Sequence, residues 1–314
     1  MPASARIPLL ITSAMQDRYV DLFRDLYDVV YAPDAAAAPA IAEHGGRIRA
    51  LVTLGTIGAK AAQMQAMPRL ELICVLGAGF EGVDLATAKA RGIAVCNGAG
   101  TNDACVADHA FGLLLAAVRG IARLDKRVRE GRWREGLFNT PSVHGKKLGI
   151  VGLGMIGRQI AKRAGGFDME MGYVSRSRKA DVPYRFFDNP LELARWCDYM
   201  IVATPGGAAT QHLINAEVIA ALGRRGTLVN IGRGSVVDTQ ALAAALASGA
   251  LASAGLDVYE HEPQVPPELT ALPNVVLTPH IGGRSPEAAH ASIEKALANL
   301  QAWSTGRPLL TPVQ

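Results

Sequence analysis

The chain has 314 residues, 49% hydrophobic and 19% charged, so it can bury a sizeable core, is not disordered, and is long enough for two domains of ordinary size. Its 32 basic and 28 acidic residues give a net charge of only +4, which disfavours nucleic acid and an anionic membrane as partners and is compatible with a small anionic ligand. No signal-peptide pattern is present, and the longest apolar run, Phe111–Val118, is too short to span a bilayer.

The distribution of the cysteines is typical of a protein in a reducing compartment. They lie in apolar or helical segments without a CxxC or metal-ligand spacing: Cys74, Cys96, Cys105 and Cys197. We expect four buried, reduced thiols and a cytoplasmic protein.

Short apolar runs alternate with helical patterns along the chain, which is typical of parallel βαβ units. In the first half, strands are predicted near Ile7–Thr12, Val29–Tyr31, Leu51–Thr53, Leu72–Val75 and Ala94–Cys96. In the second half, they are predicted near Leu148–Val151, Met169–Val174, Tyr199–Ala203, Thr227–Asn230, Ser253–Asp257 and Val275–Leu277. The sequence therefore predicts an α/β protein of two doubly wound parallel-sheet domains.

Two long helical patterns connect the domains. Asp103–Arg119 lies between them, and Pro286–Ser304, with Ile293, Leu297 and Leu300 on one face, follows the last strand. We expect this last helix to return to the first domain. The predicted division is 1–98 plus 287–314 for one domain and 99–286 for the other.

The motif Gly152-Leu153-Gly154-Met155-Ile156-Gly157 joins the 148–151 strand to a helical pattern. The first glycine permits a tight turn, the second lets the backbone approach a pyrophosphate, and the third lets helix pack against strand. This strand–turn–helix context predicts a dinucleotide-binding site.

An NAD site normally has an acid about twenty residues beyond this motif, on the adenosine ribose. This chain has Ser175-Arg176-Ser177-Arg178-Lys179 there, with three cations, two hydroxyls and no carboxylate. Arginine is a strong donor to phosphate, so the segment favours NADPH over NADH. The alternative is a solvated basic loop.

Three segments follow later predicted strands: Asn230–Asp238, Gly255–Pro263 and Leu277–Gly283. The carboxyl ends of parallel strands meet at one edge of a sheet, so Arg233, Glu262 and His280 are expected to converge there. Reduction of a 2-oxo acid uses such a trio. A guanidinium clamps the carboxylate and carbonyl, an imidazolium donates a proton, and a carboxylate orients the imidazole and keeps it charged.

These four motifs, in this order, resemble the D-2-hydroxyacid dehydrogenase family, above all its NADPH-linked glyoxylate/hydroxypyruvate and hydroxyphenylpyruvate reductases. The resemblance implies a flavodoxin-like substrate-binding domain, a Rossmann nucleotide-binding domain and a site in the cleft between them. It makes Arg233 the substrate binder, Glu262 the partner of the histidine, His280 the acid/base and Asp257 an aspartate near the nicotinamide. The segment Val75–Gly79 resembles the loop whose backbone N–H groups cradle the substrate carboxylate.

The candidate residues form two sets. The cofactor-binding set is Gly152, Gly154, Met155, Ile156, Gly157, Ser175, Arg176, Ser177, Thr204, Pro205, Ile231, Arg233, Asp257, His280 and Gly282. The substrate-binding set is Leu54, Leu76, Gly77, Ala78, Gly79, Arg233 and His280.

Several alternatives remain open. The hypothesis of a phosphoglycerate dehydrogenase is weakened because neither segment 54–58 nor segment 75–80 offers an arginine for a substrate phosphate. The hypothesis of a formate dehydrogenase is disfavoured because that branch of the family has glutamine where this chain has Glu262. A hydroxyphenylpyruvate or 2-ketogluconate reductase, and a non-catalytic corepressor that senses the cofactor, keep the same motifs. Substrate size is undetermined.

The remaining histidines are interpreted as structural or solvated: His44, His109, His144, His212, His261 and His290. A metal site is not expected, since His261, Glu262 and His280 lack ligand spacing. The basic run Arg119–Arg134 is interpreted as a solvated helical face. In the resembling reductases the region 131–138 belongs to a dimerisation arm, which implies a homodimer with Trp133 or Phe138 at the interface.

Overall fold

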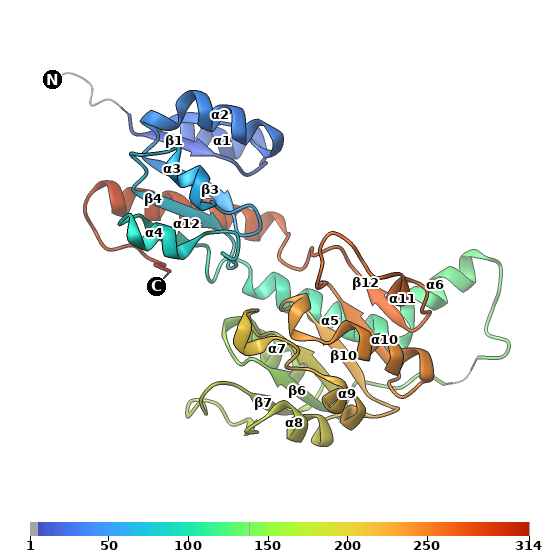
Figure 1. The fold of residues 1–314 in the computed structure, drawn as a ribbon. Helices are drawn as coiled ribbons and strands as arrows, with labels where there is room; N and C mark the ends of the chain where they lie inside the picture. Colours follow the sequence, from blue (N-terminus) through green and yellow to red (C-terminus); the bar gives the residue numbers. More distant parts are fainter. Residues whose placement is uncertain (1–5, 138, 314) are drawn as a thin grey trace. The chain divides into compact units, whose positions relative to one another are not determined.

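The computed structural model describes residues 6–137 and 139–313, and the chain divides into two compact units (Figure 1). Unit 1 comprises residues 1–102 and 284–314, and unit 2 comprises residues 103–283. The sequence-based division at 98/99 and 286/287 lies a few residues from these positions.

Unit 1 contains a five-stranded parallel sheet in the order β2-β1-β3-β4-β5. Its strands are β1 (Pro8–Ile11), β2 (Asp28–Tyr31), β3 (Ala50–Leu54), β4 (Leu72–Leu76) and β5 (Ala94–Asn97). Consecutive strand residues point to opposite faces, and both faces are covered: Leu10 and Ile73 enter one buried cluster, Leu9 and Leu72 the other. Burial on both sides is why the central strand β4 is a continuous apolar run.

The helices of unit 1 are α1 (Asp17–Arg24), α2 (Ala37–His44), α3 (Ala61–Gln65), α4 (Leu85–Ala90) and α12 (Pro286–Ser304). Helix α12 begins at Ser285, whose side chain accepts a hydrogen bond from Ala288 N–H, and it packs on β4. The last helix therefore belongs to unit 1, as predicted. Pro312 forms an antiparallel bridge with Cys96, so the C-terminal segment covers part of the β5 edge.

Two thiols meet inside the unit 1 sheet. Cys74 on β4 and Cys96 on β5 are register partners, both are buried, and their sulfur atoms lie 3.3 Å apart without a disulfide. The hydrogen bond between the thiols, together with burial, raises the pKa of Cys74 well above its ordinary value. Cys74 is therefore protonated, and the pair has a structural role in the core of unit 1.

Unit 2 contains a seven-stranded parallel sheet in the order β12-β11-β10-β9-β6-β7-β8. Its strands are β6 (Lys147–Val151), β7 (Glu170–Val174), β8 (Arg185–Phe186), β9 (Tyr199–Val202), β10 (Thr227–Asn230), β11 (Ser253–Leu256) and β12 (Val275–Leu277). The strand order reverses at β6, which pairs with β7 on one side and β9 on the other. Ligands of doubly wound sheets bind at the carboxyl end of such a switch point.

The helices of unit 2 are α5 (Asp103–Arg119), α6 (Ile121–Arg129), α7 (Met155–Gly165), α8 (Pro190–Trp196), α9 (Ala216–Leu222), α10 (Thr239–Ser248) and α11 (Pro267–Thr270). Helix α5 lies against α7 and against β10, β11 and β12 (Figure 1). Its buried residues, among them Leu113 and Leu114, share a core cluster with β6 and β9. No single described helix is long and apolar enough to cross a membrane; α5 and α6 meet the length and composition criteria only together, across a 63° bend.

The predicted fold class is confirmed, with two local corrections. Strand β8 was not predicted, because a two-residue strand carries no periodicity in the sequence. Cys105 was expected to be buried but is only half-buried, since it lies in the first turn of α5.

Candidate active site

The glycine motif forms the turn between β6 and α7. Gly152 has a φ of +101°, and a Cβ there would lie 2.9 Å from the backbone of Ala203, so only glycine fits. A Cβ at Gly157 would lie 2.1 Å from Gly152 O, whereas a Cβ at Gly154 would meet nothing within 4 Å. The turn therefore leaves open space at the helix N-terminus, and it fits the pyrophosphate of a dinucleotide.

The loop after β7 carries the basic segment. Arg176, Ser177 and Arg178 are exposed, and the Ser175 hydroxyl donates to Ser177 O at 2.6 Å. The nearby acid, Asp181, forms a bidentate pair with Arg158 at 2.8 and 3.0 Å. Its charge is thus balanced by another arginine, and the exposed guanidinium groups of Arg176 and Arg178 project from a loop whose carboxylate is already paired.

The loops after β6, β9, β10 and β11 touch one another in unit 2. Gly152 approaches Ala203 and Thr204, a Cβ at Gly232 would lie 2.5 Å from Thr204 O, and one at Gly234 would overlap the backbone of Tyr259. The predicted cofactor residues Thr204 and Pro205 therefore lie in the loop between the glycine turn and the Arg233 loop. Ile231, at the start of the Arg233 loop, is buried.

His280 and Glu262 form a hydrogen-bonded pair. His280 Nδ1 lies 2.7 Å from Glu262 Oε2, and Glu262 Oε1 accepts the Tyr259 N–H at 3.0 Å. The side chains of His280 and Glu262 are 35% and 31% exposed. Because Nδ1 is bound to the carboxylate, Nε2 is the ring nitrogen that can serve a ligand, which is the arrangement an orienting carboxylate produces.

Arg233 follows β10 on a loop organised by a buried asparagine. Asn230 donates from Nδ2 to Arg233 O at 3.0 Å and accepts the Gly232 N–H on Oδ1 at 3.1 Å. The Arg233 side chain is half-buried and donates to Gly232 O at 2.7 Å. The structure thus brings Arg233, Glu262 and His280 onto adjoining loops at the carboxyl edge of one sheet.

Asp257 holds the turn that carries His280. The Asp257 side chain is 3% exposed; Oδ1 accepts from the Thr278 hydroxyl at 2.6 Å and the Ile281 N–H at 2.9 Å, and Oδ2 accepts the Gly282 N–H at 2.8 Å. The His280 N–H donates to Asp257 O at 2.8 Å, and His280 has the left-handed φ of +51°. Asp257 therefore stabilises, at His280, a backbone conformation that residues other than glycine rarely adopt.

The substrate-loop residues belong to unit 1. Leu76 ends β4 and is buried, Leu54 ends β3 and is half-buried, and Asn97 Nδ2 donates to Ala78 O at 2.7 Å. Gly77 has a φ of +82°, and its N–H donates to Ser292 Oγ on α12 at 3.1 Å. Of the amides expected to cradle an anion, Gly77 is thus engaged inside the unit, which leaves those of Ala78 and Gly79.

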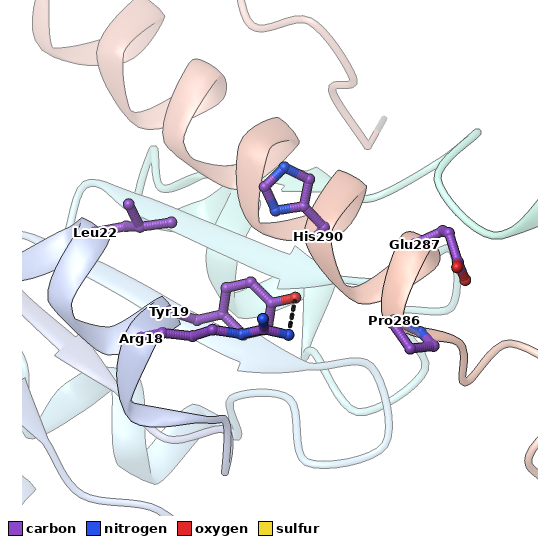
Figure 2. A pocket seen from close by; sticks show the side chains of 6 residues that line it. All are labelled: Arg18, Tyr19, Leu22, Pro286, Glu287 and His290. Carbon is purple, nitrogen blue, oxygen red and sulfur yellow. Dashed lines mark hydrogen bonds between the residues drawn. The ribbon is translucent and has the colours of Figure 1, made fainter.

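A separate pocket of unit 1 contains none of the candidate residues. The pocket lies between α1 and α12 (Figure 2). Its volume is about 520 Å³, and the Arg18 guanidinium lies 4.7 Å from the centre of the Tyr19 ring. It is lined by Arg18, Tyr19, Leu22, Pro286, Glu287 and His290. Its open, mixed lining does not match the pattern of the predicted site.

Sequence reasoning missed three residues that support the site. The Tyr259 hydroxyl donates to Thr278 O at 2.9 Å, and burial raises the pKa of Tyr259 to about 12, so this donor keeps its proton across the neutral range. The Thr278 hydroxyl donates to Asp257, and His109 Nε2 lies 2.9 Å from Thr278 Oγ1. Tyr259 and Thr278 stand inside recognised motifs, but nothing in the sequence distinguishes His109 from a structural histidine of a core helix.

The glycine turn, the switch point and the strand-end trio together define a dinucleotide-dependent oxidoreductase site. A family model described as "D-isomer specific 2-hydroxyacid dehydrogenase, NAD binding domain" matches residues 111–282. The chain belongs to the D-isomer-specific 2-hydroxyacid dehydrogenase family, which confirms the resemblance drawn from the sequence.

Relatives and solved structures agree with this assignment. The chain is 42% identical over 298 residues to hydroxyphenylpyruvate reductase of Plectranthus scutellarioides, covering 95% of this chain and 93% of the relative. It is 42% identical over 271 residues to a glyoxylate/hydroxypyruvate reductase of Arabidopsis thaliana, covering 86% and 87%. A Sinorhizobium meliloti NADPH-dependent glyoxylate/hydroxypyruvate reductase, solved with NADP and malonate, has a TM-score of 0.89 and 36% identity, covering 98% of this chain and 97% of that one.

The glycine turn supplies a matched pair of variants. Gly157→Ala should lower the melting temperature and dinucleotide affinity together, because the new Cβ meets Gly152 O. Gly154→Ala should fold normally, because its Cβ meets nothing in the protein, yet weaken the dinucleotide about tenfold or more by occupying the pyrophosphate's approach. Thermal unfolding and fluorescence titration with NADPH and NADH measure both quantities. A Gly154→Ala protein that binds both dinucleotides normally would place the pyrophosphate elsewhere.

Proposed function

We propose that this protein is an NADPH-dependent reductase of a small 2-oxo acid, with glyoxylate or hydroxypyruvate as the first candidates and hydroxyphenylpyruvate or 2-ketogluconate as larger ones. The observation that carries the proposal is the 2.7 Å pair of His280 Nδ1 and Glu262 Oε2, in which the loop of Glu262 adjoins that of Arg233. Relatives named for these reductions, including a Gluconobacter oxydans 2-ketogluconate reductase at 39% identity, support the substrate class.

Each side chain has a distinct task in this proposal. The reduced nicotinamide supplies a hydride to the substrate carbonyl when it is bound. Arg233 binds the substrate carboxylate and polarises the carbonyl oxygen. His280 donates the proton from Nε2 to that oxygen, and Glu262 holds the ring through Nδ1 and balances the imidazolium charge.

Substitution of His280 tests the chemistry. Because His280 has a φ of +51°, asparagine is the replacement that tolerates the backbone best. We expect His280→Asn to lower kcat for glyoxylate or hydroxypyruvate reduction by about 10²–10⁴-fold, through loss of the proton donor, with NADPH affinity and melting temperature nearly unchanged. NADPH consumption, followed by absorbance, measures the rate. A wild-type protein that binds NADPH but consumes it with none of the four candidate acids would favour a cofactor-sensing role.

The NADPH preference rests on the loop after β7. Ser175, Arg176, Ser177 and Arg178 offer hydroxyl and guanidinium donors to a 2′-phosphate, and the one nearby carboxylate, Asp181, is paired with Arg158. The Sinorhizobium meliloti neighbour, which is NADPH-dependent and has NADP bound, supports the same choice.

Reversal of one charge tests this preference. Arg176→Asp should remove a charge-assisted contact of about 1.5–3 kcal/mol, so NADPH affinity should fall roughly tenfold to a hundredfold while NADH affinity changes less. Arg195→Asp, at an exposed position on α8, makes the same charge change away from the loop and is the matched control. If the ratio of NADPH affinity to NADH affinity were the same in the two variants, the assignment of this loop to the 2′-phosphate would be refuted.

We also propose a cytoplasmic homodimer. The four thiols are free, as is usual in a reducing compartment. Helix α6 has no buried residue, and large apolar side chains are exposed on it and on the following segment: Ile121, Val128, Trp133 and Leu137. Trp133 is 64% exposed, whereas Phe138 lies outside the described residues. Exposed apolar side chains in such a concentration support a protein interface.

A hollow of about 480 Å³ in unit 2 supports the same surface. It is lined by the end of α5, by residues 136–137 and 139–141 and by the first residues of several strands, including Tyr199, Thr227, Ser253 and Val275. This is the amino end of the sheet, opposite the candidate active site. A second copy of the chain, with its α6 segment, would bury apolar surface there.

Sedimentation tests the dimer. The native chain of 33.1 kDa should sediment at twice its mass, and Val128→Asp should shift it toward monomer by burying an unpaired charge. Leu26→Asp, at a 59% exposed position in unit 1, is the control and should remain dimeric. A native monomer, or a Val128→Asp protein as dimeric as the control, would rule out this interface.

A further inference from the structure

We propose that His109, on α5, is a positioning residue for the acid/base His280, acting through the Thr278 hydroxyl and the Asp257 carboxylate. The role of His280 in it rests on the proposed function. His109 is remote from His280 in the sequence, and its position within an apolar helix is typical of a structural histidine. Its side chain is 25% exposed and lies 3.4 Å from Asp257 Oδ1 and 2.9 Å from Thr278 Oγ1.

The hydrogen bonds fix which atom donates. The Thr278 hydroxyl has one proton, and it donates that proton to Asp257 Oδ1 at 2.6 Å. Toward His109 the hydroxyl oxygen must therefore accept, so His109 carries a proton on Nε2. A series of hydrogen bonds therefore runs in one direction, from His109 Nε2–H to the Thr278 hydroxyl and from that hydroxyl to Asp257 Oδ1.

The last group in this hydrogen-bond series, Asp257, contacts the backbone segment that orients His280. Asp257 accepts the N–H groups of Ile281 and Gly282, the two residues that follow His280, and its carbonyl accepts the His280 N–H. Asp257 and His280 thus frame a turn with a φ of +51° at His280. A left-handed φ at a non-glycine residue persists only where its surroundings hold it.

Packing connects the same residues. A Cβ at Gly282 would lie 2.9 Å from Asp257 Oδ2 and 3.2 Å from His109 Cδ2, so the ring and the carboxylate fill the space beside this glycine. The Cys105 thiol, one turn before His109 on α5, donates to Gly282 O at 3.1 Å. Helix α5 therefore contacts the His280 turn at two points, and His109 is the one that reaches Asp257.

Removal of His109 is expected to disturb the position of the His280 ring rather than the binding of substrate or cofactor. A reacting group displaced by about 1 Å can lose roughly 10²-fold in rate. If His109 is removed, Thr278 loses one partner and the Asp257 contacts loosen, so Nε2 of His280 is held less well against the carbonyl oxygen. The glycine turn, which holds the pyrophosphate, lies on another loop, so any change in NADPH affinity should be confined to the nicotinamide side near Asp257 and should be small beside the loss of rate.

Paired variants test the proposal. His109→Leu removes the donor, and His109→Gln restores an N–H at similar reach. We expect His109→Leu to lower kcat about tenfold or more with KM for the 2-oxo acid and NADPH affinity within about threefold, and His109→Gln to recover most of the rate. His144→Leu, an exposed histidine of the same unit that contacts none of these groups, is the control and should match wild type. Equal losses in the Leu and Gln variants, in step with their melting temperatures, would reduce His109 to a structural role.

A double-variant cycle tests the route through Thr278. Thr278→Val should slow the reaction as His109→Leu does, and the double variant should be no slower than the slower single variant, because both break the same hydrogen-bond series. Effects that multiply would show that His109 acts independently of Thr278 and would overturn the proposal.

Amide hydrogen exchange gives a readout that does not depend on activity. In His109→Leu, exchange at Ile281 and Gly282 should accelerate relative to wild type and to His144→Leu, while exchange along β6 stays unchanged. Unchanged exchange at those two amides would overturn the positioning role. If wild type reduces no 2-oxo acid, the proposed function fails, and the exchange data still decide whether His109 holds this turn.

Discussion

The candidate site depends on one buried carboxylate. Asp257 accepts three hydrogen bonds from the 278–282 segment through its side chain, and a fourth, from His280, through its backbone carbonyl. A buried carboxylate without partners costs several kcal/mol, so the segment is stable only when its donors face Asp257. The same contacts determine the direction of the His280 side chain toward Glu262. The geometry of the candidate site and the burial of this carboxyl group are therefore satisfied by one set of hydrogen bonds.

The parallel sheet explains why distant motifs meet. Strands buried on both faces leave their loops as the places for polar side chains, and in unit 2 the loops that carry the candidate residues follow β6, β7, β9, β10, β11 and β12. Close approaches at Gly152, Gly232 and Gly234 hold neighbouring loops at backbone distance. These glycines do more than permit turns, because they set the spacing between the glycine turn, the loop after β9 and the Gly234–Tyr259 contact.

The sequence predicted those parts that a periodic pattern or a motif encodes. Strands such as β4 and β9 are continuous apolar runs, and the placement of Arg233, Glu262 and His280 on loops at one edge of the sheet followed from their positions after strands. Strand β8 escaped prediction because two residues have no period. The roles of His109 and of the Gly77 N–H also escaped, since each depends on a partner far away in the sequence, Thr278 and Ser292 respectively, which only packing reveals.

Each unit contains a buried thiol that can serve as a chemical probe of local unfolding. Alkylating reagents react with thiolates, and in unit 1 Cys74 is buried with a raised pKa, while in unit 2 burial raises the pKa of Cys197 to about 12. Such thiols react only when the surrounding structure opens, so their labelling rates measure local opening. Cys74 reports on one unit and Cys197 on the other. The unmodified chain can therefore show whether its two halves open together or separately, and which of them a bound dinucleotide protects.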